Sequence, residues 1–127
     1  MVRRSVEAAA RGDLEAAAAE LDPAIEVDDT DMFDAGSYRG HDAYFKWIAQ
    51  WGESFETWRV EGLEFRPAPE GRVVALFTMI ATGKGSGVEI RRSDALVCEV
   101  RGGKVVKIGY YNDQGQALDA AGLVDRA

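Results

Sequence analysis

An aspartate at the end of a short alternating segment is the first residue whose position could support chemistry. Ile25 and Val27 alternate with acidic residues over segment 25–29, and a period of two predicts a strand. Asp29 then shares the apolar face of that strand. A carboxylate in an apolar interior holds its proton more tightly than in water, which suits proton transfer to and from carbon. Asp29 is therefore a candidate general base; the alternative is a solvated acid in the cluster formed by Asp28, Asp29, Asp31 and Asp34.

A charged pair interrupts an apolar stripe further along the chain. In the strand predicted over 88–100, Arg92 and Asp94 alternate in phase with apolar residues, which are Val88, Ile90, Leu96, Cys98 and Val100. Two interpretations are open. Either Arg92 and Asp94 pair and form a polar end to an interior pocket, or a β-bulge shifts the alternation and returns both side chains to solvent.

A tyrosine and several aromatic residues complete the candidate site. Tyr110 shares a predicted strand face with Ile108 and Asn112, so its hydroxyl could donate to a developing oxyanion; the alternative is a packed tyrosine with a water partner. A helix with an aromatic face is predicted by Tyr44, Trp47, Ile48 and Trp51, spaced i, i+3, i+4 and i+7. Such a face could hold a flat ligand or belong to the core. The candidate ligand-binding residues are Tyr44, Trp47, Trp51, Leu96 and Asn112.

The residue types present do not predict a histidine-dependent, cysteine-dependent or metal-dependent site. His41 is the single histidine and stands beside Asp42, where we expect it to be exposed, so a histidine-dependent triad is not predicted. Cys98 is the single cysteine and fits a small core residue. The acidic cluster lacks the alternation and glycine of a calcium loop, and no group of cysteines and histidines could hold zinc. We expect neither a metal nor a cofactor.

The elements that must position these residues are helices followed by long strands. Helices are predicted before Gly12 and again from Asp13, a suitable N-cap, and the chain then reaches the strand that ends at Asp29. After the aromatic helix, strands are predicted over 55–65, 72–82, 88–100 and 104–112, with a tight turn at Gly102 and Gly103. A last helix should begin after Asp113. This order predicts an α+β fold in which helices cover one concave face of an antiparallel sheet.

Size and composition limit the classes of protein that the chain can represent. The chain has 127 residues, 46% of them hydrophobic, which suits one domain over 1–127. Its net charge of -7 disfavours nucleic acid and anionic membrane surfaces as partners. The longest nearly apolar run, 73–81, is far shorter than the roughly 20 residues that span a bilayer. With one cysteine and no internal disulfide, we expect a cytoplasmic protein.

The order of these motifs resembles a known family. The break at Gly12-Asp13-Leu14, the strand that ends in carboxylates, Tyr38-Arg39-Gly40 before the aromatic helix, and a closing strand from Gly103 that runs on to Asp113 are similar to the SnoaL-like branch of the nuclear-transport-factor-2-like superfamily. The resemblance covers nearly the whole chain. It implies a cone whose curved sheet wraps around N-terminal helices, an interior ligand pocket, and a homodimer packed through the outer sheet face.

The resemblance also implies roles for particular positions. Aligned with the ketosteroid isomerases, Asp29 falls on their proton-shuttling aspartate, whereas Ser5 and Leu96 stand where those enzymes have a tyrosine and a second acid. The catalytic aspartate of SnoaL-type cyclases likewise meets Leu96. Limonene-epoxide-hydrolase relatives have an Arg-x-Asp pair similar to Arg92 and Asp94, but on a different strand, and their second acid would fall on Tyr110.

Two hypotheses follow for the function. In the first, the chain is a cofactor-independent isomerase or cyclase, or else an enzyme of the epoxide-hydrolase kind, that acts on a small, largely apolar molecule. Asp29 would move the proton, while Arg92, Asp94 and Tyr110 would polarise an oxygen. In the second, it is a non-catalytic ligand-binding or accessory dimerisation module, which the residues at Ser5 and Leu96 favour.

Overall fold

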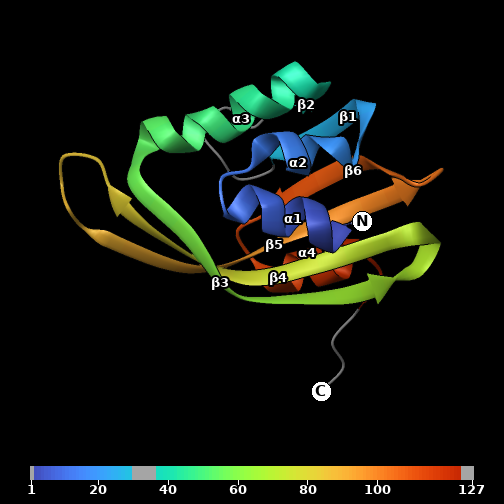
Figure 1. Ribbon diagram of the computed structural model, residues 1–127. Helices are drawn as coiled ribbons and strands as arrows, with labels where there is room; N and C mark the ends of the chain where they lie inside the picture. The colour runs from blue at the N-terminus through green and yellow to red at the C-terminus, as the bar shows by residue number, and fades with distance from the viewer. Residues whose placement is uncertain (1, 30–36, 124–127) are drawn as a thin grey trace.

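The protein is built on one curved six-stranded sheet with helices on both faces (Figure 1). A computed structural model describes residues 2–29 and 37–123. Its strands lie in the order β2-β1-β6-β5-β4-β3. The α+β architecture and the cone of sheet and N-terminal helices expected from the sequence are confirmed.

Two short helices open the chain. They are α1 (Val2–Ala10) and α2 (Leu14–Ala19), separated by Gly12, whose φ of 82° favours glycine. The side chain of Asp13 accepts a hydrogen bond from the Ala16 amide at 3.2 Å and so caps α2 as predicted. Ser5 ties the helices together, since its hydroxyl donates to the Ala17 carbonyl at 2.9 Å.

The first strand begins four residues earlier than the segment 25–29 predicted from the sequence. β1 (Leu21–Asp29) pairs in parallel with β6 and antiparallel with β2 (Ser37–Arg39). Only the part from Ile25 onward was predicted as strand, because Asp22 and Pro23 carry the signal of a helix stop rather than of a strand. β2 was not predicted from the sequence, and residues 30–36 lie outside the described part.

A helix and four strands complete the layer that surrounds the interior. α3 (His41–Ser54) is followed by β3 (Phe55–Ala68), a 3-10 turn (Pro69–Gly71), β4 (Arg72–Gly83), β5 (Glu89–Arg101) and β6 (Lys104–Tyr111). The last three connections are antiparallel hairpins. Gly102 and Gly103 have φ values of 60° and 81°, which confirms the tight turn predicted between β5 and β6.

The sheet buries apolar residues on both of its faces. On the concave face, α1, α2 and α3 cover the larger core, which includes Val27, Phe77 and Ile108. On the other face, α4 (Gln114–Ala120) packs Ala117 against a smaller core that includes Leu76. The prediction that the helices cover one face of the sheet is therefore wrong for α4 (Figure 1). The N-cap of α4 was predicted correctly, since the Asp113 side chain accepts a hydrogen bond from the Gln116 amide at 3.0 Å.

Candidate functional site

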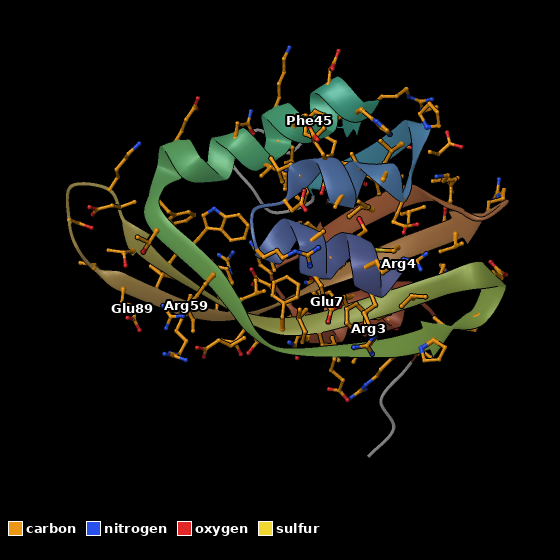
Figure 2. The ribbon with its side chains drawn as sticks, in the orientation of Figure 1. Arg3, Arg4, Glu7, Phe45, Arg59 and Glu89 are labelled. Carbon is orange, nitrogen blue, oxygen red and sulfur yellow. The ribbon has the colours of Figure 1, made fainter. Side chains whose placement is uncertain are left out.

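An interior cavity lies between the helices and the concave face of the sheet. Its volume is about 80 Å³, and apolar side chains from α1, α3 and five strands (β1, β3, β4, β5 and β6) make up most of its wall. Three hydroxyl groups belong to residues in that wall, those of Ser5, Tyr44 and Tyr110. The outward side of α1 carries Arg3, Arg4 and Glu7 (Figure 2), so the helix separates solvent from an apolar interior.

The strand register places the charged pair on the cavity side of the sheet. Asp94 lies opposite Phe77 and Arg92 opposite Met79 in the antiparallel β4–β5 pairing, which runs without a shift from Arg72 to Thr82. Phe77 and Met79 both line the cavity. The structure therefore shows Arg92 and Asp94 paired on the inner side of the sheet and not turned outward by a bulge, but neither residue is part of the cavity wall.

Arg92, Asp94 and Tyr110 form one hydrogen-bonded group, which we call the polar cluster. The guanidinium of Arg92 donates to both carboxylate oxygens of Asp94, with Nε–Oδ1 at 2.6 Å and Nη2–Oδ2 at 2.9 Å. The Tyr110 hydroxyl reaches the same Oδ2 at 2.5 Å. Asp94 has no exposed surface, whereas 33% of the Arg92 side chain is exposed. Hydrogen bonds to both oxygens offset the cost of burying the carboxylate charge.

The electrostatics of the polar cluster keep Arg92 charged and Tyr110 neutral. The hydrogen bond to Asp94 raises the pKa of Arg92, more than partial burial lowers it. Burial raises the pKa of Tyr110 well above its usual value, and the negative charge of Asp94 raises it further. The phenol of Tyr110 therefore keeps its proton throughout the physiological pH range.

Gln114 supports the polar cluster from the opposite face of the sheet and was missed from the sequence. Its side-chain amide donates to the carbonyl oxygens of Phe77 at 3.2 Å and Asp94 at 3.1 Å. Both of these residues direct their side chains to the cavity side. The capping motif at Asp113 indicated a helix start, but no pattern in the sequence shows that the next side chain reaches two strand carbonyls.

Most of the other predicted ligand-binding residues lie around the cavity. Tyr44, Trp47 and Leu96 line it, whereas Asn112 is not part of its wall. The Trp47 ring meets the Tyr110 ring edge-on, with centroids 5.9 Å apart. Aromatic packing of this kind fixes the orientation of the Tyr110 phenol.

The predicted base has a defined backbone position. Asp29 lies beside Tyr110 in the parallel pairing of β1 with β6. The side chains of Asp29 and Trp51 lie outside what the structure describes, so their proposed roles are not tested by its geometry.

Cys98 and His41 are packed as structural residues. Burial raises the pKa of the Cys98 thiol to about 12, which makes it a poor nucleophile at neutral pH. His41 is half-buried rather than exposed, because its Nε2 lies 3.1 Å from the Leu21 carbonyl oxygen. Within residues 2–29 and 37–123, no three His, Cys, Asp or Glu side chains gather as metal ligands, and no helix is long and apolar enough to cross a bilayer.

The chain is similar to a known domain family and to several solved structures. The SnoaL-like domain family matches residues 2–108. No curated protein sequence matches the chain. The fold resembles a nuclear-transport-factor-2-like protein of unknown function from Burkholderia pseudomallei, with a TM-score of 0.76, 24% identity, and coverage of 94% of this chain and 93% of that one.

Two further solved structures show the same fold. A candidate polyketide cyclase from Xanthomonas campestris has a TM-score of 0.75 and 19% identity, over 98% of this chain and 93% of that one. A protein with a ketosteroid isomerase-like fold from Catenulispora acidiphila, solved in complex with trimethylamine, has a TM-score of 0.74 and 16% identity, over 96% and 92%. These likenesses show that the three proteins share the fold of this chain. The chain belongs to the SnoaL-like family.

Proposed function

We propose that the chain binds one small, largely apolar molecule in the cavity between the helices and the sheet. The observation that carries this proposal is the wall itself, which is apolar apart from a few hydroxyl groups, one of them held in place by Asp94. Pockets for small molecules combine such walls with few, well-positioned polar groups. The hydrogen bond and the packing of Tyr110 supply that positioning.

The size of the cavity narrows the class of ligand. Its volume of about 80 Å³ is well below the roughly 300–1,000 Å³ that drug-sized ligands occupy. A single ring or a short branched chain suits this space, whereas a fused four-ring steroid or polyketide would have to displace α1 or α3. The relative solved with trimethylamine holds a ligand of comparably small size.

Binding is tested with toluene and two phenylalanine variants of α1. Methyl resonances of cavity residues, such as Leu96, should shift when toluene is titrated into the protein. In Ala9→Phe, a new ring enters the cavity from α1 and should abolish these shifts, because Ala9 lines the wall. Glu7→Phe, on the exposed side of the same helix, should bind toluene as before. Shifts scattered over the surface, or unchanged binding in Ala9→Phe, would reject the proposal.

We propose proton transfer as a second function of the same cavity. Asp29 supports it, because its backbone lies beside Tyr110, a wall residue. A base at the wall would abstract a proton from the carbon next to a carbonyl group without a cofactor. Protein-dependent incorporation of deuterium into cyclohexanone in D₂O, lost in Asp29→Asn, is the expected result. If wild-type protein produces no exchange although cyclohexanone binds, the binding function stands alone.

A homodimer in the cytoplasm remains our proposal for assembly and location. The outer sheet face carries charges of both signs, among them Arg59 and Glu89 (Figure 2), and Arg91 lies 3.7 Å from Glu61 and 3.5 Å from Glu89. A surface of mixed charge can complement a second copy of itself across a two-fold axis. The buried thiol of Cys98 suits a reducing compartment.

A further inference from the structure

The three hydroxyl residues of the cavity wall differ in where they donate their hydrogens. Ser5 donates to the Ala17 carbonyl oxygen at 2.9 Å, and Tyr110 donates to a carboxylate oxygen of Asp94 at 2.5 Å. Both of these hydrogens are engaged within the protein. Tyr44 differs, because its hydroxyl forms no hydrogen bond with any of the residues that the structure describes.

Tyr44 is a buried residue of the cavity wall. It is 3% exposed and lines the cavity from α3. The rings of Phe45 and Trp47 pack against its ring, with centroids 5.8 Å and 6.2 Å away. Burial raises the pKa of Tyr44 to about 12, so the phenol keeps its hydrogen at neutral pH. A buried tyrosine hydroxyl normally has a hydrogen-bond partner, and the cavity is the space in which a ligand can supply one.

The thiol of Cys98 lies near the Tyr44 hydroxyl and adds a second hydrogen. Cys98 lines the same cavity from β5. Beyond the effect of burial, Cys98 raises the pKa of Tyr44 further, as expected when two acidic groups lie close together. Burial also raises the pKa of the thiol to about 12, so Cys98 keeps its hydrogen and is a weak donor. One part of the wall therefore carries a strong donor and a weak one.

We propose that the ligand of this cavity carries a hydrogen-bond acceptor, such as the carbonyl oxygen of a ketone or an aldehyde, and that this oxygen accepts a hydrogen bond from Tyr44. The inference rests on the proposed binding function and names its ligand class. An acceptor pairs with the buried hydroxyl, whereas a purely apolar ligand leaves that donor unpaired and without water. The second lone pair of the same oxygen can accept from Cys98. From the sequence, the donor role was expected of Tyr110, and only aromatic contact was expected of Tyr44.

Cyclohexanone and methylenecyclohexane test the inference, because they have the same ring and differ only in an oxygen or a CH₂ group at one position. Their dissociation constants are measured by NMR titration of the wild-type protein and of Tyr44→Phe, which keeps the ring and removes the hydroxyl. Loss of one neutral hydrogen bond should weaken cyclohexanone about tenfold in this variant. Methylenecyclohexane should bind nearly as before. The matched control is Tyr111→Phe, in a residue that packs with the core on the opposite face, and both constants should stay the same.

The carbonyl stretching vibration of bound cyclohexanone provides a second readout. A hydrogen bond to the oxygen weakens the C=O bond, so the frequency in the wild-type protein should be lower than that of cyclohexanone dissolved in cyclohexane. In Tyr44→Phe, the frequency should move most of the way to the value in cyclohexane. A wild-type frequency equal to that value would overturn the inference whether or not Tyr44→Phe folds.

Each alternative outcome of the titrations has a distinct meaning. If both ligands bind and Tyr44→Phe changes their dissociation constants by the same factor, the inference is overturned while the proposed binding function stands. If Tyr110→Phe weakens cyclohexanone selectively and Tyr44→Phe does not, the donor has been assigned to the wrong tyrosine and the inference fails. If cyclohexanone, methylenecyclohexane and toluene all fail to bind, the proposed function itself is rejected and the inference falls with it.

Discussion

At the scale of single residues, the stability of the molecule depends on the hydrogen bonds made to the buried carboxylate of Asp94. A fully buried carboxylate is stable only when charged and polar partners compensate for the loss of water. Here Arg92 supplies two donors and Tyr110 a third. The cluster is therefore a unit, and the loss of one member changes the environment of the other two.

Removing Arg92 should destabilise the protein strongly. Arg92→Met leaves the buried charge of Asp94 without its cation and should cost about 3 kcal/mol, the lower end for a broken buried pair because a third of the Arg92 side chain is exposed. Urea unfolding measures the difference. Arg91→Met is the matched control on the outer face and should cost less than about 1 kcal/mol. Equal losses at the two positions would show that burial of the pair has no energetic role.

The buried phenol of Tyr44 and the buried thiol of Cys98 predict a loss of stability at alkaline pH. Burial raises the pKa of Tyr44 and of Cys98 to about 12 in the folded state. In the unfolded chain, the pKa values of these two groups are near 9–10. At a pH between these values and about 12, the unfolded chain releases protons that the folded chain retains. The free energy of unfolding is therefore highest below about pH 9 and falls as the pH rises. Urea unfolding at pH 8, 9, 10 and 11 should show this decline. Cys98→Ala should make the free energy of unfolding fall less steeply with pH above pH 9. An equally steep fall in this variant would contradict the role given to the Cys98 thiol.

At the scale of elements, α4 joins the outer layer to the wall of the cavity. Its small residues pack on the sheet, and Gln114 at its start donates to the carbonyls of Phe77 and Asp94. Gln114→Ala should cost about 1–3 kcal/mol, because two carbonyl oxygens lose a donor in a partly buried position. Gln116→Ala, an exposed change on the same helix, should be nearly neutral. Thermal unfolding compares the two variants, and equal midpoints would contradict this role of Gln114.

Elements were largely predictable from the sequence, and their placement less so. Turn glycines and caps act over a few residues, so the hairpin at Gly102 and the cap at Asp113 were predicted correctly. The face that α4 covers depends on long-range packing, and the family pattern ends at residue 108, before this helix. The alternation over 88–100 allowed the inward pair of Arg92 and Asp94 but could not exclude a bulge. Gln114 acts through backbone carbonyls, which leave no signal in the residue types around it.

At the scale of the whole molecule, the sheet separates two different environments. Its concave face and the helices enclose an apolar cavity, whereas much of the outer face beyond α4 is charged. In our proposals, the interior binds a small ligand by its shape and polarity, and the outer face packs against another copy of the chain.

The proposed homodimer makes a prediction about salt and charge. Sedimentation at micromolar concentration should give a dimer that weakens as ionic strength rises, because charged contacts at the surface are screened. Arg91→Glu should weaken the dimer at least tenfold by placing like charges beside Glu61 and Glu89. The control is Arg39→Glu, on β2 at the opposite edge of the sheet, which should leave the dimer intact. A monomer for the wild-type protein would remove the dimer from the description.

The parallel pairing of β1 with β6 sets the order in which the molecule can be completed during synthesis. Leu21 lies beside Val105, whose amide donates to the Glu20 carbonyl at 3.0 Å, and the Lys104 ammonium donates to the Ala19 carbonyl at 2.7 Å. β1 therefore meets β6 only after residues 104–111 have left the ribosome, although it can pair with β2 earlier. Until then, the sheet that α1 and α2 cover is incomplete, because β6 is missing between β1 and β5. Non-local contacts of this kind form slowly, so the nascent chain has a long interval in which those helices are open to chaperones or to misassociation.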